Sequence, residues 1–299
     1  MPPSILITVD VEDWFQVENF KPYIPFSTWP QKELRVEKNV HRLLNLFDTF
    51  NEQRTTNDGH KKKSMKATFF VLGWLAKRIP HLINEIHDRG HEVASHGFNH
   101  NLCAEQSSHS LKQDLLDSKK LLEDTIGYSV NGFRAPSFSI NNDILKVIEN
   151  CGYLYDSSFN SFAIHGRYGK LLLNCNSRRG ISYQVSNSFF ELPVSNVSIG
   201  KDFVLPWAGG AYFRLIPFPI FKCGVSNILN KKNAYLFYMH PWEIDPDQPR
   251  VNKASSSCKF RHYINLDKTF SKLYRFIEQF SHCRFITCQQ YLNKIANTP

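Results

Sequence analysis

The sequence predicts an α/β protein whose strands form a parallel sheet or barrel, and two observations carry this prediction. Short apolar runs that suit buried strands alternate along the 299 residues with segments whose apolar residues recur at helical spacing. Several of these runs end in a polar residue capable of catalysis or metal binding, as expected at the carboxyl edge of a parallel sheet. No internal repeat or linker interrupts the alternation, so we expect a single domain over residues 1–299.

The first strand is predicted at residues 5–9, where β-branched and apolar side chains lead into the carboxylates Asp10, Glu12 and Asp13. Acids placed where a buried strand ends are costly unless they are paired or hold a metal. Residues 14–30 carry three prolines among aromatic side chains, which predicts an irregular loop after the acids.

The next units repeat the order of helix and strand. Apolar residues recur at helical spacing over residues 40–50, and the polar residues 51–63 predict a solvated loop. A buried strand is predicted over 67–73, a helix over 74–89 and a short strand over 91–95. Two further units follow: a helix over 107–126, a strand over 130–133 that ends at Arg134, a helix over 142–150 and a strand over 153–155 that ends at Asp156.

The alternation breaks over residues 157–188, a segment with scattered glycine and arginine that we expect to be an insertion or a lid. Residues 189–194 resume strand character, and residues 205–219 are rich in aromatic residues, glycine and proline, which suits a surface that cradles a ligand. The remaining predicted elements are a strand over 234–239 that ends at His240, a helix over 267–280 and a short strand over 284–287.

Composition narrows the class of protein. An aromatic share of 14% and an apolar share of 42% exclude a disordered chain, and the net charge of +9 suits anionic partners without specifying any chemistry. The short run Lys61 to Lys63 reads as a solvated loop, so we expect no nucleic-acid partner. Seven cysteines without a CxxC pair predict free thiols in a reducing compartment.

Location is predicted from the same residues. No basic region precedes the first apolar run, so no signal peptide is expected, and no apolar run approaches membrane-crossing length. We therefore expect a cytoplasmic protein without a transmembrane segment, with peripheral contact to the inner face of the membrane as an alternative.

His96 and His100 carry the first chemical signal, because two histidines four residues apart can bind one metal ion. The spacing alone is weak, since His87 and His91 share it although Gly90 interrupts them and no strand end presents them.

Position strengthens the signal from the first pair. Predicted strands end at potentially reactive residues, namely Asp10, His96, Arg134, Asp156 and His240. One carboxylate, two imidazoles and an open position for water form the ligand set of a hydrolytic zinc site.

These residues also match a known family. The chain resembles the polysaccharide deacetylases of carbohydrate esterase family 4, which share the NodB homology domain, and looks closest to the branch linked to exopolysaccharide gene clusters with its Asp-Val-Glu-Asp opening. The resemblance runs from Ile5 to about Glu243 and rests on five motifs, at Thr8 to Asp13, Ser95 to His100, Arg134 to Pro136, Asp156 to Ser158 and Phe237 to Pro241. It implies a distorted (β/α) barrel of about seven parallel strands and a divalent metal, commonly Zn²⁺.

The resemblance implies a role for each matching residue. Asp10 would be the general base that deprotonates the attacking water, and Arg134 would hold Asp10 ionised and correctly aimed. His96 and His100 would be metal ligands. His240 would protonate the leaving amine, and Asp156 would hold the tautomer of that imidazole and favour its charged form.

Two parts of the site stay open at this point. The common family pattern has adjacent acids followed by Gly-Pro, so the third metal ligand here is either Glu12 or Asp13, and strand alternation places Glu12 on the side of Asp10. A backbone N–H near Pro136 and Ser137 would stabilise the oxyanion with the metal, although Ser137 and Phe138 stand where many members have tyrosine.

Further candidates lie near the pocket. Trp207, Trp242 and Tyr212 suit the core or the rim, and one of them could stack on a sugar. Glu191 suits either a supporting position behind the site or an ordinary strand end.

Three functions fit the sequence. The first is a metal-dependent N-deacetylase that acts on an acetylated amino sugar of a surface polysaccharide or of its lipid- or nucleotide-linked precursor. The second is a hydrolase of the same fold that acts on a cyclic imide, a ureide or another non-sugar amide. The third is a catalytically silent glycan-binding protein, which the joint presence of base, ligands and acid disfavours.

Overall fold

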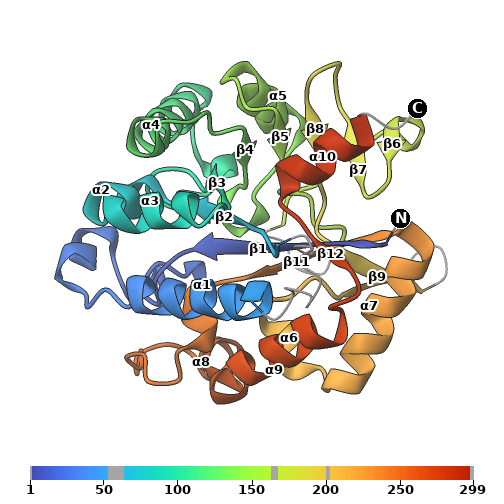
Figure 1. Cartoon of the computed structure of the whole chain (residues 1–299). Coiled ribbons are helices and arrows are strands. Elements are labelled where there is room, and N and C mark those ends of the chain that lie inside the picture. The colour runs from blue at the N-terminus through green and yellow to red at the C-terminus, as the bar shows by residue number, and fades with distance from the viewer. Residues whose placement is uncertain (1, 53–63, 163–167, 200–202, 297–299) are drawn as a thin grey trace.

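The computed structural model describes residues 2–52, 64–162, 168–199 and 203–296. In these residues one curled sheet organises the chain, and helices lie around it (Figure 1). The strands of the sheet follow the order β11 (Ala234–Met239), β1 (Ser4–Val11), β2 (Ala67–Val71), β3 (Glu92–Ser95), β4 (Gly132–Phe133), β5 (Tyr155–Asp156), β8 (Phe190–Glu191), β7 (Ser182–Gln184) and β6 (Arg178–Arg179).

The predicted α/β class is confirmed, and the sheet forms a half-barrel. Neighbouring strands from β11 to β8 pair in parallel, whereas β8, β7 and β6 pair antiparallel. Within the described residues the path does not join β11 to β6, so the curled sheet stays open. The strand β12 (Arg284–Phe285) adds to β1 in parallel, and β9 (Asn196–Ile199) with β10 (Phe203–Pro206) forms a separate antiparallel pair.

Strand β1 lies second from one edge of the parallel part, between β11 and β2 (Figure 1). Each of its eight residues is buried, because both faces of the strand are covered. The register pairs Ile5 with Tyr235 and Val9 with Met239, which aligns the carboxyl ends of β1 and β11.

The helices occupy most of the predicted segments. They are α1 (Val36–Glu52), α2 (Gly73–Arg78), α3 (Pro80–Asp88), α4 (Ser108–Ile126), α5 (Asn142–Asn150), α6 (Gly210–Leu215), α7 (Phe218–Lys232), α8 (Ser256–Tyr263), α9 (Leu266–Gln279) and α10 (Cys288–Ala296). Short 3₁₀ helices are η1 (Glu18–Phe20), η2 (Phe26–Gln31), η3 (Cys103–Glu105), η4 (Pro136–Phe138), η5 (Cys175–Ser177) and η6 (Pro241–Ile244). No described helix is long and apolar enough to cross a membrane.

One helix that was predicted as continuous is divided into two. The segment 74–89 forms α2 and α3, which meet at Ile79 with φ −131° and ψ 57°. Pro80 causes the break, because proline donates no backbone hydrogen bond and disfavours helical geometry in the residue before it. The predicted loop over 14–30 likewise contains η1 and η2.

The predicted insertion falls partly outside the described residues, which omit 163–167 and, in the polar loop predicted earlier, 53–63. In its described part, β6 and β7 continue the sheet beyond β8. Tyr168 from this segment lines the cavity described below, and the role of a lid stays a prediction.

Aromatic packing attaches the C-terminal elements to the sheet. Phe213 of α6 lies 5.0 Å from Phe237 of β11, measured between ring centroids, and Phe237 stacks at 5.4 Å on Phe276 of α9. Burial of such large rings is worth several kcal/mol in total. This packing places Arg214, the residue after Phe213, beside the end of β11.

Candidate active site

A cavity of about 360 Å³ opens where the parallel strands end. Its lining includes Asp10 and Glu12 from the end of β1, His96 and His100 after β3, and His240 after β11. Of the five strand-end residues predicted to gather at the carboxyl edge of the sheet, Asp10, His96 and His240 line the cavity, whereas Arg134 and Asp156 do not.

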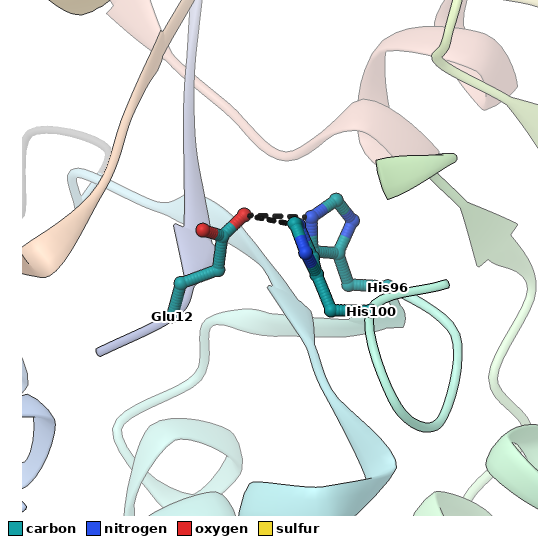
Figure 2. Close-up of side chains that lie close together, drawn as sticks. All are labelled: Glu12, His96 and His100. Atoms are coloured by element: carbon teal, nitrogen blue, oxygen red, sulfur yellow. Dashed lines mark hydrogen bonds and ion pairs between the residues drawn. The ribbon is translucent and has the colours of Figure 1, made fainter. Parts of the chain in front are cut away.

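Glu12, His96 and His100 form the tightest group. One oxygen of Glu12, Oε1, lies 3.1 Å from Nε2 of His96 and 3.0 Å from Nε2 of His100, and the three side chains point toward one another (Figure 2). All three are buried, and their ligand atoms lie within 4.8 Å of one another.

The donor chemistry of this group fits a divalent cation. His96 Nδ1 donates to the carbonyl oxygen of Arg134 at 2.7 Å, which leaves Nε2 to face Glu12 with a lone pair in the neutral ring. His100 Nε2 is buried, and its 3.0 Å contact with Glu12 Oε1 lacks the geometry of a hydrogen bond. Two ligands about 2.05 Å from a tetrahedral Zn²⁺ stand about 3.3 Å apart, close to the separations observed here.

Asp13 lies elsewhere, which decides between the two candidate acids. Its Oδ2 accepts hydrogen bonds from the backbone N–H groups of Arg35 and Val36 at 2.7 and 2.9 Å, and its Oδ1 accepts from Trp14 N–H at 2.8 Å. Asp13 thus joins the N-terminus of α1 to the end of β1. The alternative that Asp13 binds the metal is wrong, because both of its oxygens are engaged outside the cluster.

Asp10 and Arg134 form a fully buried pair. Arg134 Nη1 donates to Asp10 Oδ1 at 2.7 Å and to Thr8 Oγ1 at 2.7 Å, while Nε and Nη2 donate to the carbonyl and hydroxyl oxygens of Ser157 at 2.9 and 2.8 Å. Because Oδ1 is held by the guanidinium, Oδ2 is the oxygen of Asp10 that faces His240, at 4.0 Å from Nε2.

His240 has a different carboxylate partner from the one predicted. Its Nδ1 lies 2.8 Å from Glu243 Oε1, which also accepts from the backbone N–H of His240 at 3.0 Å. Burial lowers the pKa of His240, but the charges of Glu12 and Glu243 and the hydrogen bond to Glu243 outweigh this and raise it to about 9.

The role predicted for Asp156 is wrong. Asp156 Oδ1 accepts from the hydroxyl of Ser158 at 2.7 Å, and Oδ2 accepts from the backbone N–H of the same residue at 2.9 Å. The register of β5 and β8 places Glu191 directly opposite, and burial together with Asp156 raises the pKa of Glu191. Four strands, β1 to β4, separate β5 from β11 in the sheet order, and Asp156 is not part of the cavity lining.

Glu243 and Arg214 are the functional candidates that the sequence did not single out. Arg214 Nε donates to Glu243 Oε2 at 2.8 Å, and both side chains are 1% exposed. Glu243 stands three residues after His240, a spacing that could have drawn attention to it. Arg214 lies far away in sequence and carries no motif.

Not all of the predicted substrate-binding residues are accessible from the cavity. Ser137 and Tyr212 line the cavity, whereas Pro136 is buried and is not part of its lining. Trp242 lines the cavity but is only 6% exposed, and its ring stacks on His240 and His262 with centroids 5.1 and 4.1 Å away. It therefore offers little surface to a sugar and supports His240 instead.

The electrostatics of the cluster favour an ionised carboxylate. Burial would raise the pKa of Glu12, but His100 and His240 hold it well below its usual value. The pKa of His262, under Trp242, is lowered by burial and by the charge of Arg214, so this ring is neutral.

Comparison with known proteins identifies part of the chain. Residues 46–155 match the family model of polysaccharide deacetylases. The peptidoglycan-N-acetylglucosamine deacetylase of Bacillus cereus is 34% identical over 88 residues, which cover 29% of this chain and 41% of that protein. PgdA of Listeria monocytogenes, a protein of the same description, is 28% identical over 130 residues, or 43% of this chain and 28% of that protein.

Over residues 46–155 the chain is therefore similar to polysaccharide deacetylases. It spans well under two thirds of the length of these curated relatives, with 41% and 28% of them covered. Residues 157–293 match a second model, described as a domain of unknown function (DUF3473). His240, Glu243 and Arg214 lie in that second range, whereas His96, His100 and Arg134 lie in the first.

Solved structures show that the fold is shared over nearly the whole chain. A Mycobacterium smegmatis protein described as a polysaccharide deacetylase superposes with a TM-score of 0.63 at 18% identity, covering 99% of this chain and 94% of that one. PuuE allantoinase gives a TM-score of 0.58 at 13% identity, with 96% and 88% covered. At these identities the likeness concerns the fold alone.

Proposed function

We propose that the chain is a metal-dependent hydrolase that removes an N-acetyl group from an amino sugar of a polysaccharide. The observation that carries the proposal is the cavity in which Asp10 and His240 face each other beside Glu12, His96 and His100. The match to polysaccharide deacetylases and the peptidoglycan deacetylases among the relatives support the choice of an acetylated glycan.

In the proposed reaction, Asp10 acts as the general base and His240 as the general acid. Asp10 takes a proton from the water that attacks the acetyl carbonyl, so that a C–O bond forms. His240 then gives its proton to the nitrogen as the C–N bond breaks, and acetate and a free amine leave. The short distance between Asp10 Oδ2 and His240 Nε2, 4.0 Å, suits an acid and a base on either side of one scissile bond.

Other residues of the chain orient these groups. Arg134 occupies one oxygen of Asp10 and leaves the other free for the water proton. Pro136 has no N–H, and Phe138 N–H donates to the Ala135 carbonyl at 2.9 Å, so the predicted oxyanion donor narrows to the N–H of Ser137. A divalent metal held by Glu12, His96 and His100 would lower the pKa of water and polarise the acetyl carbonyl.

The finer assignments belong to the same proposal. We infer a surface polysaccharide or its lipid- or nucleotide-linked precursor as the substrate, in line with the Asp-Val-Glu-Asp opening at residues 10–13. Zn²⁺ is the proposed metal, since one carboxylate and two imidazoles suit it. Location in the cytoplasm stays a prediction that cell fractionation tests.

The test compares wild type with Asp10→Asn on N-acetylglucosamine oligomers, with released acetate and bound metal as the two measurements. We expect wild type to release acetate and to lose this activity with a chelator. Asp10→Asn should keep its metal and lose about 10²- to 10⁴-fold in turnover, the usual contribution of a general base. A wild-type protein that binds metal and releases no acetate from any acetylated glycan would overturn the proposal.

A further inference from the structure

We propose that Glu243 and Arg214 are positioning residues that hold His240 in the tautomer and orientation of the acid. The proposal rests on the proposed function, because it explains how His240 would serve it. It also gives a role to the segment over residues 157–293, which matches a domain of unknown function and contains all three residues.

The contact between Glu243 and His240 determines which ring nitrogen faces the cavity. A carboxylate accepts hydrogen bonds, so the 2.8 Å contact places a proton on His240 Nδ1. Nε2 is then the nitrogen 4.0 Å from Asp10 Oδ2. The same Glu243 oxygen accepts from the His240 backbone N–H at 3.0 Å, so the carboxylate holds both the ring and the chain beneath it.

Arg214 holds the other oxygen of Glu243. Its Nε donates to Oε2 at 2.8 Å, and its terminal nitrogens donate to the carbonyl oxygens of His262 and Ile264 at 2.7 and 2.9 Å and of Arg261 at 2.9 Å. The guanidinium is therefore tied to the end of α8 as well as to α6. With both oxygens engaged, the Glu243 carboxylate cannot turn away from His240 without leaving a buried charge unpaired.

The burial of Arg214 and Glu243 shows that they do not form an ordinary surface ion pair. Arg214 and Glu243 are each 1% exposed as side chains, and Arg214 also lies 5.4 Å above the Trp242 ring that stacks on His240. The predicted partner, Asp156, is engaged with Ser158 and cannot take this role. Glu243, held by Arg214, thus takes the role that was predicted for Asp156.

The test uses two substrates that differ in their need for an acid. The amine of an N-acetylglucosamine oligomer leaves only when protonated, whereas the 4-nitrophenolate of 4-nitrophenyl acetate leaves without a proton. Glu243→Gln is the direct variant, since the amide cannot accept from His240 and also from Arg214 Nε. Glu243→Leu with Arg214→Met removes the acceptor for His240 together with both charges, so it folds without an unpaired buried charge. Asp156→Asn is the control.

We expect both Glu243 variants to lose about 10²-fold or more in kcat on the oligomer, the scale of general acid catalysis, and less than tenfold on the ester. Asp156→Asn should lower both rates by the same factor. Equal losses on the two substrates in the charge-free double variant would overturn the proposal, because a structural role alone would act on both.

A spectroscopic measurement separates this proposal from the proposed function. In ¹⁵N-histidine-labelled protein held at a pH above the pKa of His240, where the ring is neutral, His240 should show a protonated Nδ1 in wild type and a mixture of tautomers in the double variant. An unchanged His240 signal would contradict the positioning role even in an active enzyme. An inactive wild type with the expected change would contradict the proposed deacetylation and keep the positioning role.

Discussion

At the scale of single residues, neighbouring acids take separate tasks because successive side chains leave a strand end in different directions. Asp10 and Glu12 alternate onto the cavity side, whereas Asp13 accepts three backbone N–H groups, one of them from Val36 at the start of α1 and one from Arg35 just before it. Burial raises the pKa of Asp13 to about 6, against the N–H groups that lower it. Its role is therefore to fasten α1 to β1.

The two roles predict opposite results for Glu12→Gln and Asp13→Asn. Glu12→Gln should lose bound metal, because a charged ligand is removed, while the free energy of unfolding of the metal-free protein changes little. Asp13→Asn should keep the metal and lose about 1–2 kcal/mol of stability, the scale of a lost helix cap. Elemental analysis and urea titration measure these quantities, and metal loss in Asp13→Asn alone would reverse the assignment.

A second residue-scale prediction concerns His91, which is buried between Phe47 and Phe69. Its Nδ1 accepts from the Ala67 N–H at 3.1 Å, and burial with the charges of Lys66 and Arg89 lowers its pKa to about 3. The unfolded chain binds a proton near pH 6.5 that the folded chain does not, so stability falls as pH decreases through 6.5.

This linkage predicts that protonation at His91 lowers the free energy of unfolding by about 1.4 kcal/mol when the pH falls from 7.5 to 5.5. His91→Asn keeps an acceptor for the Ala67 N–H, so it should be less stable than wild type at pH 7.5 and should lose about 1.4 kcal/mol less on acidification. Urea titrations at the two pH values measure this difference. His282→Asn, at an exposed position, is the control, and an equal pH slope in wild type and His91→Asn would refute the prediction.

At the scale of elements, the segment between β10 and α6 depends on a close approach of two backbones. Gly209 has φ 140° and forms a parallel bridge with Tyr238 of β11. A Cβ there would overlap the Tyr238 carbonyl oxygen. Because α6 begins at the next residue and carries Arg214, this approach places Arg214 within reach of Glu243.

We therefore predict that Gly209→Ala lowers the free energy of unfolding by more than about 2 kcal/mol, through backbone strain and overlap together. Gly127→Ala is the matched control. Gly127 also has a positive φ, 73°, but nothing lies within 4 Å of the position that a Cβ would take. We therefore expect this variant to lose about 1 kcal/mol in free energy of unfolding. Thermal unfolding measures both, and equal losses would show that overlap with Tyr238 does not matter.

At the scale of the whole molecule, the two matched segments share one sheet. The segment after residue 156 supplies β11, which pairs with β1 through six residues, from Ser4 with Ala234 to Val9 with Met239. It also supplies His240, and the first segment supplies His96 and His100. The cavity is consequently complete only when both segments are present.

A chain that ends at Asp156 should therefore fail to fold cooperatively, because β1 would lose a neighbour and expose an apolar edge. Near-ultraviolet circular dichroism and a urea titration measure this, and co-expression of residues 157–299 should restore a cooperative transition. A sharp unfolding transition in the short chain alone would contradict the view that the segments form one folding unit.

Local patterns in the sequence determined much of the fold and half of the site. Sequence patterns predicted α5 at its observed bounds and α4 to within one residue. In the structure, Ser107 caps the first turn of α4 and Gly127 ends it. Strand ends predicted Asp10, His96, Arg134 and His240 at one edge, because parallel strands align their carboxyl ends.

Only the tertiary structure decided which carboxylate serves which partner. Glu12 and Asp13 differ by one position, and the N-terminus of α1, more than twenty residues away, is what engages Asp13. Arg214 reaches Glu243 through the packing of α6 and α8 beneath β11. Sequence spacing reports the face of an element on which a side chain lies, whereas hydrogen-bond partners depend on which elements pack together, and that is set by burial of apolar surface across the whole chain.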